Sequence, residues 1–390
     1  MLAFAEVDFV DFHTRVLEER IAGGTGALAG PDVADAPALG FRVGSHAYSY
    51  VPVDGTVEVR AGDADAATVI ALDAATFSDY ANELRTCFGI VYGGEGTLVR
   101  GGFDDWFRWE PAIRALYHGR PLYDPAWVAG VDLARTFTLA DTDAEIAGFL
   151  ASVGFAHVRG VFSPAEIAEL IAETERLESL AAPDDARSWW TTVDGAAACC
   201  RLIYTNERSG PISALVDDPR LRRFRGLAGE GLVPELDCLD GIGVVIKQPG
   251  ADSGLADLPW HQDCGLGGHP VLCPSIAVGI QLDPATAETG QLHFLAGSHR
   301  GSSHQLRARD LDDLPTVAVD AEPGDVTLHY GHVLHAAPAP TGRCSGRRAM
   351  YVTATRPATI EFVGRGRGYN DVLFARDGQV RNVDEFVTSD

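Results

Sequence analysis

The short motif His261-Gln262-Asp263, with a distant partner at His335, constrains this chain more than any other feature. Side chains alternate in an extended segment, so His261 and Asp263 share one face and Gln262 points away. Two imidazoles and one carboxylate that bind one face of a divalent iron are typical of non-haem Fe(II) oxygenases. The alternative is a surface His-x-Asp with an unrelated buried histidine. If the three residues do meet, the fold must bring the chain back from a distant segment to the first pair.

The segments after this motif have the character of short strands separated by turns. Ser275–Leu282 is an apolar run that ends at the turn residues Asp283-Pro284. Three further segments are predicted to be strands: Gln291–Leu295, Val326–Tyr330 and Arg347–Ala354. The motif therefore belongs to a series of strands, which improves the case for a metal site.

Four stretches, taken in order, resemble the phytanoyl-CoA dioxygenase family of Fe(II)/2-oxoglutarate oxygenases. They are WHQD at 260–263, GQLHFLAGSHR at 290–300, GDVTLHYGHVLHAA at 324–337 and GRRAMYV at 346–352. The resemblance extends from about residue 142 to about 356. It implies an α+β chain whose main domain is a double-stranded β-helix, a cupin-like jelly-roll with flanking helices.

The same resemblance implies which residues hold the cofactors. His261, Asp263 and His335 would bind Fe(II), and Arg347 would pair with the far carboxylate of 2-oxoglutarate, with O2 as the second cosubstrate. A planar guanidinium matches a carboxylate independently of any family. Arg348 is the next residue on the strand and should face the other way.

Other histidines near the end of the motif compete for the third ligand position. His329 and His332 lie close in sequence, but the position before the Ala-Ala-Pro turn favours His335. His332 is then a rim residue or a core histidine. The family often has Gly-Ser after the final histidine, and Ala336-Ala337 here lacks the hydroxyl that would bind the cosubstrate.

Lys247 is the only lysine in the chain and follows an apolar strand that leads toward the motif. It either faces a carboxylate in or near the site, or is an exposed edge residue that discourages strand aggregation. We include Lys247 and Gln281 as candidates for cosubstrate binding. The candidates for a substrate or rim role are Trp260, Cys264, His332, Trp189, Tyr204 and Asn206, with core packing as an equal alternative for the tryptophans.

The first third of the chain lies outside the oxygenase pattern and predicts a separate accessory domain of α+β type. We place it at residues 1–140 and the oxygenase domain at 141–390. Within it, Ala75–Cys87 has the spacing of an amphipathic helix, and Phe103–Tyr117 carries several aromatic residues. The stretch from about 56 to 120 is weakly similar to sterol-carrier-protein-like domains, although such aromatic clusters more often form a core.

The composition limits the classes of partner. A net charge of −24 argues against nucleic acid and anionic membrane surfaces, and no segment is apolar enough to cross a bilayer. Seven scattered cysteines, and no signal peptide, favour a reducing cytoplasm. We expect hydroxylation of an aliphatic C–H in a small natural-product or lipid-like substrate, with release of succinate and CO2. A homodimer is a further expectation. The alternatives are a catalytically silent lipid or small-molecule binding protein, or a cupin-type enzyme that uses another metal.

Overall fold

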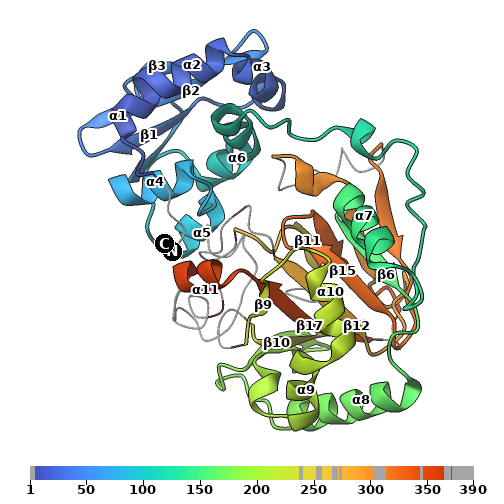
Figure 1. Cartoon of the computed structure of the whole chain (residues 1–390). Helices are drawn as coiled ribbons and strands as arrows, with labels where there is room; N and C mark the ends of the chain where they lie inside the picture. Colours follow the sequence, from blue (N-terminus) through green and yellow to red (C-terminus); the bar gives the residue numbers. More distant parts are fainter. Residues whose placement is uncertain are drawn as a thin grey trace. The chain divides into compact units, whose positions relative to one another are not determined.

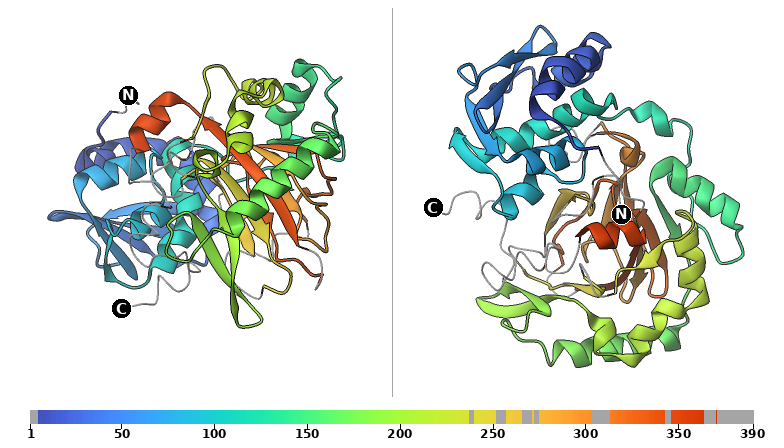
Figure 2. Two further views of the ribbon diagram at one scale, coloured as in Figure 1. Left: turned by 90° about the horizontal axis from the view of Figure 1, so that it is seen from below. Right: turned by 60° about the vertical axis from the view of Figure 1, so that its left-hand side comes forward.

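The computed structural model describes residues 5–236, 240–251, 257–265, 271, 275–302, 313–342, 346–363 and 370. The chain forms two compact units, which Figures 1 and 2 show. The first contains Met1–Asp124 with Cys264–Leu272 and Arg300–Gln305, and the second contains Pro125–Asp263, Cys273–His299 and Leu306–Asp390. The main segment of the first unit thus ends at Asp124, and the domain boundary at residue 140 stays a prediction.

The first unit is built on a five-stranded sheet with the order β3-β2-β1-β4-β5. Its strands are β1 (Leu39–Val43), β2 (His46–Val53), β3 (Thr56–Ala61), β4 (Thr68–Leu72) and β5 (Thr97–Arg100). Neighbouring strands are antiparallel except β1 and β4, which are parallel. The helices are α1 (Phe9–Asp11), α2 (Leu17–Ala22), α3 (Thr25–Ala29), α4 (Ala74–Ala81), α5 (Cys87–Tyr92) and α6 (Phe103–His118), with a π-helical turn at Phe12–Val16.

The aromatic residues of α6 belong to the core of this unit. Trp106 and Trp109 are fully buried, as are Phe41 of β1 and Phe77 of α4. Trp106 donates a hydrogen bond from its indole to the Tyr80 hydroxyl at 3.0 Å, so the polar atom of this ring is satisfied. These rings are packed inside the unit rather than gathered on its surface.

The helix that we predicted at Ala75–Cys87 is wrong in its length, because the chain forms two shorter helices there. α4 ends at Ala81, and Glu83 adopts the left-handed conformation with φ of 57°. A residue in that conformation cannot continue a right-handed helix. Thr86 then caps α5 by accepting a hydrogen bond from the Gly89 amide at 2.9 Å.

The second unit contains an antiparallel sheet of eight strands and another of four. The large sheet has the order β6-β15-β12-β17-β10-β8-β7, and β9 pairs with one end of β17. Its strands are β6 (Phe155–Val158), β7 (Ser188–Val193), β8 (Ala196–Leu202), β9 (Val233–Pro234), β10 (Ile242–Lys247), β12 (Ile276–Gln281), β15 (Val326–Tyr330) and β17 (Arg347–Thr355). The small sheet has the order β11-β16-β13-β14, from β11 (Leu258–His261), β13 (Leu292–Leu295), β14 (Thr316–Val319) and β16 (His335–Ala337). This is the double-stranded β-helix that the resemblance implied.

The helices of this unit are α7 (Asp143–Val153), α8 (Pro164–Glu178), α9 (Gly210–Ala214), α10 (Pro219–Gly226) and α11 (Pro357–Val363). Ser163 caps α8 with its hydroxyl and Pro164 opens the helix, as its sequence predicts. Among the described residues, the chain also forms short 3₁₀ turns at Gly30–Val33, Pro125–Val128, Thr205–Glu207, Leu215–Asp217 and Ser298–Arg300. None of the helices in the described part of the chain combines the length and apolar character needed to span a bilayer.

The large sheet has one apolar face and one polar face. On β12 and β17, Ile280 and Met350 belong to the core, which also includes Leu221 and Phe224 of α10; Figure 1 shows α10 beside these strands. Because side chains alternate, the intervening residues face the other way. Gln281 of β12 and Arg347 of β17 are among them, so the polar face is where a site can form.

Candidate metal centre and cosubstrate anchor

Strand pairing in the small sheet brings two of the predicted ligands together. His261 of β11 and His335 of β16 lie directly opposite each other, with ring centroids 4.2 Å apart. Asp263 follows β11, and its Oδ1 atom lies 3.7 Å from Nε2 of each histidine. In the described ranges these three residues form the one group whose ligand atoms all lie within 4.8 Å of one another. The distant segments thus converge as the motif requires.

His261 and His335 both turn their Nε2 atom toward Asp263. Nδ1 of His261 lies 2.7 Å from the Pro259 carbonyl, and Nδ1 of His335 lies 3.0 Å from the Val333 carbonyl. A carbonyl only accepts, so each Nδ1 carries the proton and each Nε2 keeps a lone pair for a metal.

The electrostatics of the site favour the protonation states that bind a metal. Burial lowers the pKa of His335 to about 3, and burial also lowers the pKa of His261. Burial raises the pKa of Asp263, but the imidazoles of His335, His329 and His261 outweigh it and lower this pKa below its ordinary value. Neutral imidazoles beside an ionised carboxylate need lose no proton before a cation binds.

Gln262, between the two ligands in sequence, is directed elsewhere. Its side-chain amide donates a hydrogen bond to the His332 carbonyl at 2.6 Å. Strand alternation predicted this orientation. The contact also fastens the motif to the segment that precedes His335, so the two halves of the site are held together by backbone as well as by strand pairing.

Arg347 is a buried cation on the polar face of the large sheet. Its side chain is 2% exposed and donates to the Gly290 carbonyl at 2.9 Å and to Oε1 of Gln281 at 3.2 Å. No carboxylate of the described residues forms an ion pair with it. Arg348 instead faces outward and pairs with Asp283 at 2.7 Å. A buried guanidinium without a counter-ion is suited to an anionic ligand.

Lys247 lies beside this arginine. It is 1% exposed, is the direct cross-strand partner of Arg347, and donates from Nζ to the Ala337 carbonyl. Burial and the neighbouring guanidinium lower its pKa to about 7. Our alternative of an exposed edge residue is wrong, because β10 lies between β17 and β8.

The donor set fits the cofactors that the motif implied. Two imidazoles and one carboxylate suit Fe(II), whose remaining positions stay open for other ligands. The buried pair Arg347 and Lys247 suits the far carboxylate of a dicarboxylic acid such as 2-oxoglutarate. Gln281 contacts Arg347 directly, so it can orient the guanidinium.

Two residues beside the site were not among our cosubstrate or substrate candidates. Tyr351 lies at position i+4 from Arg347 on β17, and Gly279 opposite it leaves room for the ring. His329 contacts both Tyr351, with ring centroids 6.4 Å apart, and Asp263, at 3.3 Å. Alternation puts Tyr351 on the same face of β17 as Arg347, but only the pairing of β15 and β17 with β12 brings both residues to the site.

The candidates for a substrate role lie in different surroundings. Trp189 stacks with the Arg201 guanidinium at 4.8 Å on the strand pair β7–β8. Asn206 uses its side chain to hold the backbone at Leu236 and Ile242, which is a structural role.

The remaining candidates divide in the same way. Tyr204 is 8% exposed and lies under the Arg187 guanidinium at 4.8 Å. His332 stacks on Tyr330 with ring centroids 5.5 Å apart and meets the His299 ring edge-on at 5.9 Å. Trp260 is half-buried and precedes His261 on β11, where the register with β16 shifts between Leu258 and His261. Cys264 is buried in the first unit rather than placed at a rim.

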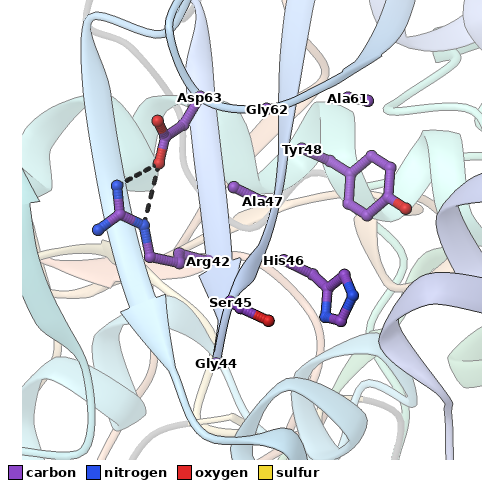
Figure 3. A pocket seen from close by; sticks show the side chains of 9 residues that line it. All are labelled: Arg42, Gly44, Ser45, His46, Ala47, Tyr48, Ala61, Gly62 and Asp63. Carbon is purple, nitrogen blue, oxygen red and sulfur yellow. Dashed lines mark hydrogen bonds and ion pairs between the residues drawn. The ribbon is translucent and has the colours of Figure 1, made fainter.

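A hollow of about 510 Å³ lies on the first unit, and Figure 3 shows the nine residues that line it. Arg42 and Asp63 are paired there, with Nε of the arginine 3.0 Å from the carboxylate. His46 and Tyr48 project from β2 at the other side. Its charges satisfy each other, and its lining contains no part of the ligand group described above.

Several solved structures are similar to this chain. The chain is similar to the structure of AviO1 from Streptomyces viridochromogenes Tue57, with 24% identity, a TM-score of 0.44 and coverage of 56% of this chain and 96% of that one. It is also similar to the non-heme alpha ketoglutarate dependent carbocyclase SnoK from nogalamycin biosynthesis. The identity is 22% and the TM-score 0.46, with coverage of 57% of this chain and 87% of that one. The structure of EctD from S. alaskensis with bound Fe has 20% identity and a TM-score of 0.48, with coverage of 62% of this chain and 84% of that one. No curated protein matches the sequence.

The family model for phytanoyl-CoA dioxygenase (PhyH) matches residues 150–349, which is just over half of the chain and includes all three candidate ligands and Arg347. The chain therefore belongs to the phytanoyl-CoA dioxygenase family and is a non-haem iron, 2-oxoglutarate-dependent oxidoreductase with Fe(II) as cofactor and 2-oxoglutarate and O2 as cosubstrates.

Proposed function

We propose that this enzyme hydroxylates an aliphatic C–H of a small natural-product or lipid-like substrate, with release of succinate and CO2. His261, Asp263 and His335 hold the iron in this proposal. The observation that carries it is the convergence of their ligand atoms within 4.8 Å, with both Nε2 atoms turned toward Asp263. When bound, Fe(II) supplies the redox chemistry that couples oxidative decarboxylation of 2-oxoglutarate by O2 to substrate oxidation.

Arg347, Lys247 and Gln281 bind the cosubstrate in the same proposal. Arg347 and Lys247 are both almost completely buried and lie opposite each other on β17 and β10. A carboxylate placed between them offsets charge that is otherwise expensive to bury. Gln281 accepts from Arg347 through Oε1 and donates through Nε2 to Thr327 at 3.3 Å, which fixes the orientation of its amide.

The substrate class rests on charge and on the aromatic residues near β7 and β8. A net charge of −24 opposes a polyanionic ligand such as an acyl-CoA thioester, so we favour a neutral or weakly charged molecule. Trp189 is 2% exposed, and its ring stacks against the Arg201 guanidinium of the neighbouring strand. We propose that residues of the strand pair β7–β8 contact the substrate. We also propose that the protein forms a homodimer.

The decisive experiment measures succinate formed from 2-oxoglutarate under air, with added Fe(II) and a panel of small natural products and fatty acids. We expect succinate in a stoichiometric ratio to a hydroxylated product, and loss of both in Asp263→Ala. A silent binding protein would bind a panel member without succinate release. A cupin-type enzyme with another metal would convert a substrate without consuming 2-oxoglutarate, and either result would overturn the proposal.

A further inference from the structure

His329 lies beside the proposed ligand group without belonging to it. It stands on β15 in the interior of the large sheet, between Ala277 of β12 and Phe155 of β6, and is 2% exposed. Its Nε2 atom lies 3.3 Å from Oδ2 of Asp263. Oδ1 of the same carboxylate faces His261 and His335 at 3.7 Å. The two oxygens of Asp263 therefore have different surroundings.

His329 forms its hydrogen bond through the other ring nitrogen than the two ligand histidines do. His261 and His335 each engage Nδ1 with a backbone carbonyl and turn Nε2 toward the site. In His329 it is Nε2 that is engaged, and Nδ1 has no partner within the described residues. An ionised carboxylate only accepts hydrogen bonds, so Nε2 of His329 carries the proton and has no lone pair for a metal.

Asp263 needs such a partner because little else restrains it. Its side chain is 44% exposed, and His329 provides its one side-chain hydrogen bond in the described part of the chain. His329 itself is held firmly, with the rings of Phe294 and His335 at 5.3 and 4.6 Å between centroids. A firmly packed donor can fix the rotation of a carboxylate that has one side-chain hydrogen bond.

We propose that His329 is a positioning residue, which holds Oδ2 of Asp263 so that Oδ1 faces the metal. The inference rests on the proposed ligand set and deepens it. Partners of ligating groups of this kind usually change metal affinity or activity by about 10–100-fold when they are removed. A merely structural histidine would change stability and leave iron affinity as it is.

The test compares Fe(II) affinity and the absorption of the anaerobic Fe(II)–2-oxoglutarate complex in four variants. His329→Phe removes the donor and keeps a ring, and His329→Gln restores an N–H donor. His293→Phe is the matched control, because His293 alternates with Phe294 on β13 and faces away from this cluster. Asp263→Ala reports on the ligand set itself, and circular dichroism and Tm confirm that each variant is folded.

We expect His329→Phe to weaken Fe(II) binding by about 10–100-fold, His329→Gln to recover most of it, and His293→Phe to match the wild type. Wild-type iron affinity in a folded His329→Phe, with binding lost in Asp263→Ala, would overturn the positioning role and leave the ligand set intact. Complete loss in both His329 variants would make His329 a ligand and also overturn it. Unchanged binding in Asp263→Ala would instead contradict the proposed function. If His329→Phe does not fold, His329→Leu, which also lacks a donor, is measured in its place: the positioning role predicts the same loss of about 10–100-fold in Fe(II) affinity, and wild-type affinity in folded His329→Leu would overturn it.

Discussion

Lys247 and Arg347 are direct partners across β10 and β17, which places the only lysine of the chain beside a buried arginine. Opposite residues in an antiparallel pair have their side chains on the same face. Burial lowers the pKa of Lys247 most, and the repulsion between these two like charges lowers it further. A carboxylate bound between them would offset this repulsion, in keeping with the proposal that a dicarboxylate is the cosubstrate.

Arg347→Gln should raise the Kd for 2-oxoglutarate by about 100-fold, since charge-assisted hydrogen bonds to a carboxylate contribute about 3 kcal/mol. Titration of the anaerobic Fe(II) protein with 2-oxoglutarate measures this. Arg348→Gln is the matched control, because Arg348 pairs outward with Asp283 and Glu175. Equal effects of the two substitutions would contradict the assignment of Arg347.

The affinity for 2-oxoglutarate should depend on pH through Lys247. Its pKa is about 7 in the free protein, so the ammonium is protonated below that value and mostly neutral above it. A bound dianion favours the protonated form, so affinity is highest below pH 7 and falls as the pH rises, by at most about tenfold per pH unit. The Kd measured on both sides of pH 7 checks this. The same pH dependence in Lys247→Met would assign it to another group.

Gly279→Ala should destabilise the second unit and disturb Tyr351. A Cβ at this position would lie 2.7 Å from both Oγ1 of Thr327 and Cε1 of Tyr351. Overpacking of this kind costs about 1–3 kcal/mol, which a lower Tm would show. Gly243→Ala on β10 is the control, since the nearest atom there is an ordinary 3.6 Å away. Equal Tm values for Gly279→Ala and Gly243→Ala would contradict the close contact of Gly279 with Thr327 and Tyr351.

The first unit contains a buried ion pair that should dominate its stability. Glu110 and Arg114 of α6 are 2.8 Å apart, with side chains 0% and 5% exposed. Arg114→Met removes the cation that pairs with this carboxylate, which keeps its hydrogen bonds from the backbone amide and thiol of Cys87, and should lower the free energy of unfolding by about 3–5 kcal/mol. Arg108→Met on the same helix removes a pair with the exposed Asp35 and should cost below about 1 kcal/mol. Urea denaturation compares the two, and similar losses would mean that burial does not matter here.

Several features of the fold follow from local sequence. Ser163 and Pro164 start a helix because capping depends on residues that are adjacent in the chain. Alternation along the strand predicts that Arg347 and Arg348 point to opposite faces. Arg347 is indeed buried, and Arg348 pairs with Asp283 at the outer face. The His-x-Asp spacing likewise indicates which side chains can converge, since period two is a property of any strand.

Other features depend on pairing between distant segments and could not be read locally. Whether Lys247 is at an edge is decided by β8 and β17, which come from far away in the sequence. The end of α4 depends on the left-handed conformation of Glu83, although glutamate is a good helix former. His329 and Tyr351 lie near the site because β15 and β17 flank β12, an order that no single strand reveals.

The central claim is that His261, Asp263 and His335 form the iron site, and one spectrum tests it most directly. Under anaerobic conditions, Fe(II) and 2-oxoglutarate added to the wild-type protein should give the visible absorption band of their chelate. Asp263→Ala should abolish that band or weaken it severely, because it removes the only carboxylate of the ligand group. A band of wild-type intensity in a folded Asp263→Ala protein would contradict the account.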